Sequence, residues 1–225
     1  MTTASVGRSS PIGVRILRLA FAILGAVALA WIPLRNIDSD VFSIANYFSY
    51  FTILSNVASV VVLFVGGAFD PPGELWQRLR GAVTVYMVIT CIVYAVLLAN
   101  IDVMLNDKWI NDVLHRLIPV VLLLDWVLFP PRRRIDDRHV LAWLGFPVVY
   151  GVYSLVRGPL VDWYPYPFLD PREQGYLSLA LGLVVLLIGF VLIALAVGVL
   201  GRLAARWRYG SVARATVDAT SDDRE

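Results

Sequence analysis

The sequence is poor in the residue types that most catalytic and metal sites use. It has one cysteine, Cys91, and two histidines, His115 and His139, among 225 residues. One cysteine excludes an intrachain disulfide and a cysteine-rich metal site, and so few histidines with scattered carboxylates make a poor zinc site. There is no glycine-rich loop that could cradle phosphate and no Gly-x-Ser-x-Gly nucleophile elbow. We therefore expect neither a metal nor an organic cofactor.

Charged residues are scarce as well, and apolar residues are abundant. Only 16% of the chain is Asp, Glu, Lys or Arg, whereas 59% is hydrophobic, unlike an average soluble domain. Several apolar runs approach or exceed the roughly 20 residues that cross a bilayer. No basic patch interleaved with aromatic residues suggests nucleic acid as a partner. These features predict an all-α, polytopic protein of the cell membrane whose partner is the lipid bilayer.

The spacing of the apolar runs predicts a bundle of six transmembrane helices. We place these helices at about 14–34, 44–67, 80–100, 112–130, 139–157 and 175–200. They form one domain, residues 13–207, between an N-terminal tail (1–12) and a C-terminal tail (208–225) that are expected to be disordered. The first apolar run lacks a small-residue cleavage site, which indicates a retained helix rather than a signal peptide.

The distribution of arginine predicts the orientation of these helices. Arginines flank the start of the first helix, lie in the loops around residues 78–80 and 132–138, and follow the last helix. In a six-helix bundle all of these positions fall on one side of the membrane. Because short cytoplasmic loops are enriched in Lys and Arg, we expect both termini to be cytoplasmic. The first, third and fifth loops then face outward.

A histidine stands at the mouth of the helix expected at 112–130. The segment from Asn111 to His115 ends a polar loop and leads directly into apolar sequence, and Pro119 follows one turn later. An ionisable group in such a place is costly and marks a candidate functional site. The alternative is an interfacial histidine that bonds a loop. Pro119 is expected to free a backbone carbonyl near His115, because proline has no N–H.

Small polar side chains form a stripe along the helix expected at 44–67. They recur at spacings of three and four and therefore share one helical face: Ser49, Thr52, Ser55, Asn56 and Ser59. Such a stripe should face protein or a wet cavity. Because both helices descend from the outer side, Thr52 and His115 are expected at similar depth. A threonine that only bonds the preceding turn or packs between helices is the alternative.

Two other features bear on a site at this level. Tyr94 lies near the outer end of the helix expected at 80–100 and is a candidate hydrogen-bond partner. Asp125 lies about 15 Å deeper than His115, and we expect it to be buried, either paired with an Arg or Tyr of another helix or held neutral. The fifth loop, from Trp163 to Leu169, is rich in aromatic residues and proline. It suits the headgroup layer, with a partly buried lid over the bundle as the alternative.

Several short motifs occur here in a characteristic order. They are Tyr50-Phe51-Thr52-Ile53-Leu54, an Asn111-x-x-x-His115 ahead of a proline, and the outer Trp163-Tyr-Pro-Tyr-Pro-Phe-Leu169 loop, within six expected helices. Together they resemble the androgen-induced protein family, which includes the androgen-dependent TFPI-regulating protein and bacterial relatives. The similarity runs from the second expected helix through the fifth loop, more than half of the chain.

The resemblance implies a membrane hydrolase that cleaves fatty acid esters of hydroxy fatty acids with a threonine nucleophile and a histidine. By motif, these residues correspond to Thr52 and His115. The chain departs from the animal members in three places: Asp112 stands where they have a second histidine, the proline lies one residue nearer to His115, and the aromatic loop has an extra residue. The departures concern the substrate more than the Thr–His pair.

The residues allow a hypothesis for catalysis. His115 would accept the Thr52 proton, because a threonine hydroxyl is a poor nucleophile without an adjacent base. Asn111 or Asp112 could orient the imidazole, and Asn56 or Tyr94 could donate to an oxyanion. The substrate would be a lipid ester or another amphiphilic small molecule. In the alternative function, the same pocket binds a lipid or amphiphile without cleaving it, as a sensor, carrier or scaffold. The oligomeric state is not predicted.

Overall fold

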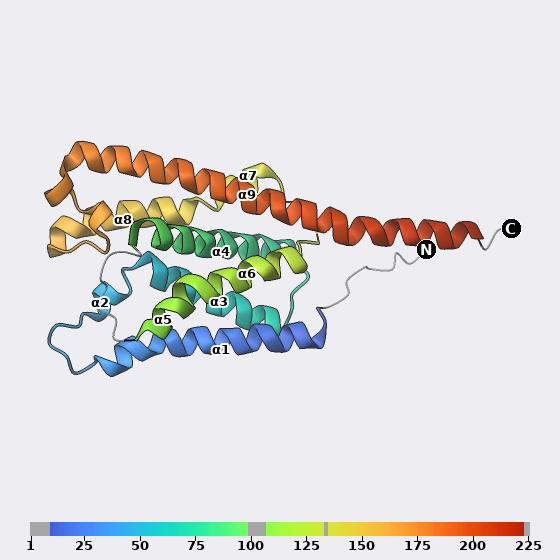
Figure 1. The fold of residues 1–225 in the computed structure, drawn as a ribbon, viewed down its shortest axis with the longest axis horizontal. Helices are drawn as coiled ribbons and strands as arrows, with labels where there is room; N and C mark the ends of the chain where they lie inside the picture. The colour runs from blue at the N-terminus through green and yellow to red at the C-terminus, as the bar shows by residue number, and fades with distance from the viewer. Residues whose placement is uncertain (1–9, 99–106, 133–134, 223–225) are drawn as a thin grey trace.

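The computed structural model describes residues 10–98, 107–132 and 135–222, and within these residues it contains helices and turns but no strand (Figure 1). Most of the expected N-terminal tail, the end of the helix expected at 80–100, and Arg133 and Arg134 lie outside the described residues. In the described parts of the chain, five stretches are long and apolar enough to cross a membrane: Ile12–Arg35, Phe51–Ala68, Glu74–Leu98, Asp137–Val161 and Gln174–Tyr209. The all-helical class is confirmed, and the length and composition of the apolar helices are compatible with an integral membrane protein.

The long helices lie side by side in one bundle (Figure 1). α1 (Ile12–Arg35) packs along α3 (Phe51–Ala68), α3 packs along α4 (Glu74–Val93), and α4 also contacts α9 (Pro171–Asp222). α9 continues as a helix to Asp222, whereas the sequence predicts a tail from residue 208. α7 (Asp137–Ala142) and α8 (Gly145–Val161) replace the single helix expected at 139–157.

The helix expected at 112–130 consists of three consecutive helical segments. They are α5 (Lys108–Asp112), the π-helical η2 (Val113–Leu117) and α6 (Ile118–Leu128). This stretch is not among the five apolar ones and carries four charged residues. It nevertheless lies inside the bundle, because α6 packs against α4 and α9 and η2 packs against α1 and α4.

The helix expected at 44–67 is broken near its start, which corrects the sequence prediction. α2 (Ile44–Tyr47) ends early, and Tyr50 has an extended backbone with ψ 132° before α3 begins at Phe51. The Ser49 hydroxyl bonds the Ala45 carbonyl at 2.7 Å, and the Tyr150 hydroxyl of α8 donates to the Ser49 carbonyl at 2.9 Å. These side-chain bonds replace helical ones. The break places Thr52 in the first turn of α3, where backbone N–H groups lack helical partners.

A buried charge cluster joins three helices at the end of the bundle opposite α2. Arg18 of α1 donates to one Asp125 oxygen at 2.7 Å, and Arg80 of α4 donates to the other at 2.7 Å. Arg18 also pairs with Asp70 at 3.1 Å, just beyond α3. All four side chains are largely shielded from solvent. The expectation that Asp125 is buried and paired with an arginine is confirmed.

We expect Asp125→Asn to destabilise the protein strongly, because an amide leaves the buried Arg80 without its carboxylate partner and leaves Arg18 with Asp70 alone. Removing one partner of a buried pair typically costs several kcal/mol, so the Tm in detergent should fall by roughly 10 °C. Asp137→Asn is the matched control, since Asp137 is mostly exposed where it pairs with Arg202, and its Tm should change little. Equal shifts in the two variants would contradict the role of the cluster.

Candidate active site

Thr52 and His115 meet near the end of the bundle that carries α2 and α5. The Thr52 Oγ1 lies 3.2 Å from the His115 Nε2. Thr52 is buried in the first turn of α3, and His115 is half-buried in η2. Both side chains line a pocket of about 550 Å³, which we call the outer pocket. The two residues that the sequence predicts at similar depth are therefore in hydrogen-bond contact.

The second ring nitrogen of His115 determines which tautomer is present. Nδ1 lies 3.1 Å from the backbone carbonyl oxygen of Asn111. A carbonyl can only accept a hydrogen bond, so in the neutral ring Nδ1 carries the proton. The lone pair of Nε2 then points at the Thr52 hydroxyl, which donates to it. This assignment follows from the hydrogen-bond network and gives His115 the orientation of a base.

Two π-helical turns shape the surroundings of His115. In η2, the Ile118 N–H donates to the Val113 carbonyl five residues earlier, and Pro119 cannot donate to the His115 carbonyl, because it has no N–H. The other π turn, η1 (Tyr94–Leu98), extends α4. Such turns are rare and frequently occur at functional sites.

Tyr94 holds the imidazole from one face. Its ring stacks on His115 with the centroids 4.3 Å apart and an angle of 30° between the planes. The Asn111 side-chain amide donates to the Tyr94 hydroxyl at 2.5 Å. Tyr94 and Asn111 therefore position the ring together, Tyr94 through its ring and Asn111 through its backbone carbonyl and its side chain.

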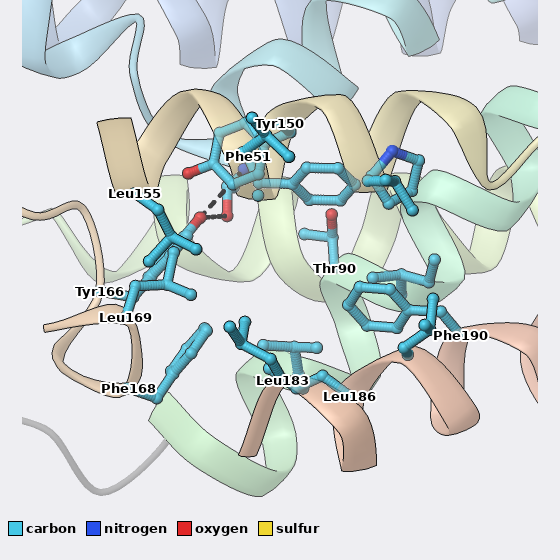
Figure 2. Close-up of a pocket in the computed structure, with 18 of the residues that line it drawn as sticks. Phe51, Thr90, Tyr150, Leu155, Tyr166, Phe168, Leu169, Leu183, Leu186 and Phe190 are labelled. Carbon is cyan, nitrogen blue, oxygen red and sulfur yellow. Dashed lines mark hydrogen bonds between the residues drawn. The ribbon is translucent and has the colours of Figure 1, made fainter. Parts of the chain in front are cut away.

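Tyr166 is the site residue that sequence reasoning missed. Its hydroxyl oxygen accepts the Thr52 N–H at 3.3 Å and lies 3.4 Å from the Thr52 Oγ1, so its own proton can be donated to that oxygen. Figure 2 draws these bonds as dashed lines at Tyr166. Burial raises the pKa of Tyr166 above its usual value, which keeps the hydroxyl protonated near neutral pH.

The aromatic loop packs closely against Gly158, and this packing lets Tyr166 reach into the bundle. A Cβ at this glycine would come within 2.0 Å of the Tyr164 ring, so only glycine permits the packing. The Trp163 N–H donates to the Gly158 carbonyl at 3.1 Å and turns the loop back. Tyr166 and Leu169, at the end of η3 (Pro167–Leu169), are buried. The aromatic sequence of this loop was the available signal, but its spacing does not identify which tyrosine faces Thr52.

Two other candidates, Asn56 and Asp112, bond protein groups near the site. Asn56 donates its amide to the carbonyls of Thr52 at 2.9 Å and Leu114 at 3.1 Å, so both of its N–H groups are engaged and it ties α3 to η2. Asp112 pairs with Arg116 at 2.5 Å on an exposed face. The Asn111 carbonyl, not Asp112, bonds the ring, and the Tyr166 hydroxyl lies 3.4 Å from the Thr52 Oγ1.

A second cavity adjoins the site on the other side of Thr52. It has a volume of about 230 Å³, and Thr52 and Tyr166 line both it and the outer pocket. His115 lines only the outer pocket. Within the part of the chain that the structure describes, no group of three or more His, Cys, Asp or Glu side chains could hold a metal ion.

Searches against models of known families, curated proteins and solved structures found no match for this chain. Geometry is therefore the basis for its chemistry: a hydroxyl, a base with a determined tautomer and a phenol donor converge on one point between two cavities. That arrangement can carry out acyl transfer to a threonine oxygen.

We expect ¹⁵N NMR of the detergent-solubilised protein to show His115 protonated on Nδ1 and unprotonated on Nε2 at neutral pH. The reason is the bond from Nδ1 to the Asn111 carbonyl. The measurement uses the His139→Gln variant, in which His115 is the remaining histidine, so that the spectrum contains one set of ring signals. Thr52→Val, the companion variant, should shift the Nε2 resonance and leave Nδ1 protonated. A ring that is protonated on Nε2, or that averages between tautomers, would contradict the assignment.

Proposed function

We propose that this protein is a membrane-embedded lipid-ester hydrolase in which Thr52 is the nucleophile and His115 the general base. The observation that carries the proposal is the 3.2 Å contact between the Thr52 hydroxyl and the Nε2 lone pair of His115. A threonine hydroxyl needs an adjacent base to attack, and the base must lie within hydrogen-bond reach of the proton that it takes. A third group, the Asn111 carbonyl, orients that base as in a catalytic triad.

The reaction proceeds in two halves. As Nε2 takes the hydroxyl proton, the Thr52 oxygen bonds to the ester carbonyl carbon, and the carbonyl oxygen becomes an oxyanion that accepts the Tyr166 hydroxyl proton in a hydrogen bond. The C–O bond to the alcohol breaks, and the imidazolium protonates the departing alkoxide. In the second half, His115 takes a proton from water as the water oxygen bonds to the acyl carbon of the acyl-threonine. The bond between that carbon and the Thr52 oxygen then breaks, the imidazolium returns its proton to Thr52, and the fatty acid is released.

The proposal includes a six-helix topology with the site on the outer side. Lys108–Leu128 is the sixth span. Of its charged residues, Asp125 pairs with Arg18 and Arg80 inside the bundle, and Asp112 pairs with Arg116 on an exposed face. The start of α1 and the end of α9 lie at the end of the bundle opposite α2 and α5 (Figure 1). Because arginines gather at that end, both termini are cytoplasmic under the positive-inside rule.

The family resemblance supports the same chemistry. We propose that the chain is a member of the bacterial branch of the androgen-induced protein family, whose motif residues correspond to Thr52 and His115. Two observations support this proposed membership: the contact between these two residues, and the burial of Tyr166 and Leu169 in the aromatic loop.

We expect the detergent-purified protein to hydrolyse members of a panel of lipid esters, and Thr52→Ala and His115→Ala each to lower kcat/KM by at least about 10³-fold, because nucleophile and base act as a unit. Thr52→Ser, which keeps the hydroxyl, is the matched variant and should retain measurable turnover. Gel filtration and Tm measurements would show that the variants are folded. Full activity in either alanine variant would overturn the mechanism. A folded wild type without activity would favour the alternative, a protein that binds a lipid or amphiphile without cleaving it.

Tyr166→Phe should lower kcat by about 10²-fold with a smaller effect on KM, because the lost hydroxyl interacts most strongly with the oxyanion of the transition state. Tyr176→Phe, at an exposed position of α9, removes an equivalent hydroxyl away from the site and serves as the control. If the two variants have the same kcat, Tyr166 is a packing residue and another group supports the oxyanion.

A further inference from the structure

The cavity of about 230 Å³ beside Thr52 is apolar over nearly all of its wall. We call it the apolar chamber, and Figure 2 shows its side chains converging from α3, α4, α8 and α9. Among the residues that the structure describes, no charged side chain lines it. Its few polar groups are engaged elsewhere: the Tyr150 hydroxyl donates to the Ser49 carbonyl, and the Thr90 hydroxyl to the Tyr86 carbonyl. An apolar cavity of about 150 Å³ admits benzene, so this chamber has room for several methylene groups.

The position of His115 determines which half of an ester can enter the chamber. The two cavities meet at Thr52 and Tyr166, where the carbonyl carbon must lie for attack. His115, which must protonate the leaving oxygen, lines only the outer pocket. The alcohol half therefore extends into the outer pocket, and the acyl chain extends in the opposite direction.

We propose that the apolar chamber is the binding site for the acyl chain of the ester, and that the outer pocket takes its alcohol half. This assignment rests on the proposed hydrolase function. The side chains that line the two cavities support this assignment. The outer pocket has polar side chains such as Ser43, Asn46 and Asn111, which suit an alcohol half with further polar groups, whereas the chamber suits only hydrocarbon.

The chamber opens toward the lipid between α8 and α9. Val148, Val152 and Leu187 line it and are also each about half exposed on the surface of the bundle. An acyl chain can therefore enter sideways. Because lipid tails are as apolar as the wall, transfer into the chamber gives little free energy, and selectivity comes from fit. The wall of α8 from Pro147 to Leu155 extends about 12 Å, and Phe190 lies on the opposite side of the chamber from Tyr166 (Figure 2).

Gly151 offers a way to fill the chamber without disturbing the bundle. It lies one turn from both Pro147 and Leu155 on the lining face of α8, and a Cβ at this position would meet no atom within 4 Å. Leucine at position 151 should occupy the space that a chain would use. Gly182 of α9 is the matched control, since it is exposed, does not line the chamber and also has open space around a Cβ.

The test uses p-nitrophenyl butyrate, octanoate, dodecanoate and palmitate, which share one alcohol and differ only in the acyl chain. We expect Gly151→Leu to lower the ratio of kcat/KM for dodecanoate to that for butyrate by about tenfold, as overpacking by one side chain predicts. Gly182→Leu should keep the wild-type ratio. An unchanged ratio in an active Gly151→Leu enzyme would overturn the acyl-chain site.

A second series of butyrate esters with alcohols of increasing length tests the direction of the substrate. Gly151→Leu should have the same preference as the wild type across this series. If the variant instead discriminates among the alcohols and not among the acyl chains, the alcohol half lies in the apolar chamber and the assignment is wrong.

A binding measurement separates failure of the chamber from failure of the hydrolase. Palmitate with a diazirine at its chain end is cross-linked to the protein in lipid nanodiscs, and the labelled residues are located by mass spectrometry. We expect labels on the chamber residues of α8 and α9, lost in Gly151→Leu and kept in Gly182→Leu. If no ester is cleaved but this pattern appears, the chamber binds the chain and only the catalytic proposal fails. Labels spread over all lipid-facing helices would overturn the chamber itself.

Discussion

The hydrogen bond between the His115 ring and the Asn111 carbonyl is the interaction on which the site depends. In an apolar bundle a polar group without a partner is expensive, so the ring N–H and the backbone carbonyl each satisfy the other. Because the carbonyl accepts only, the imidazole proton stays on Nδ1, and the basic nitrogen faces Thr52. Tyr94 stacks on the same ring and holds it in the plane that this geometry requires.

Irregular backbone gathers around that bond. The break before α3 leaves the Thr52 N–H without a helical acceptor, and the Tyr166 hydroxyl supplies one. The π turns at η1 and η2 bring Tyr94 and His115 face to face. A departure from a regular helix leaves backbone groups without helical partners, and side chains near the site bond two of them: Tyr166 bonds the Thr52 N–H, and Asn56 bonds the Leu114 carbonyl. The features that weaken the helices here are the ones that create a hydroxyl–imidazole–phenol arrangement between two cavities.

The opposite end of the bundle has a different character. There Arg18 and Arg80 both pair with Asp125, and Arg18 also pairs with Asp70, in a compact and largely shielded set of charges that joins α1, α4 and α6. With the helices tied at that end, their other ends can enclose cavities and a folded-back loop. Side chains that line a cavity make fewer packing contacts than side chains in a filled core. The ion pairs at the opposite end of the bundle stabilise the helices and offset this loss.

The sequence by itself determined the helical class and most of the helices, and it indicated the two residues that meet at the candidate site. Length and hydropathy of apolar runs are local properties, so α1 follows from them within two residues at each end, whereas α4 begins six residues before its expected start and α9 continues well past its expected end. The polar stripe that contains Thr52 and the histidine at the start of a helix are also local features of the sequence. Because successive helices alternate in direction, the helices that carry these two residues begin at the same end of the bundle, and the two residues lie at similar depth.

Tertiary structure decided where the helix before Thr52 breaks, which residue orients His115 and which tyrosine reaches Thr52. The break depends on a bond between Ser49 and Tyr150, 101 residues apart, and the phenol contact joins residues 114 apart. Asn56 was a plausible oxyanion donor by its position on the stripe, but the Leu114 carbonyl of another helix occupies its amide. The periodicity of the sequence predicts which face of a helix a side chain lies on. The residue that it contacts there depends on how segments that are distant in the sequence pack against each other.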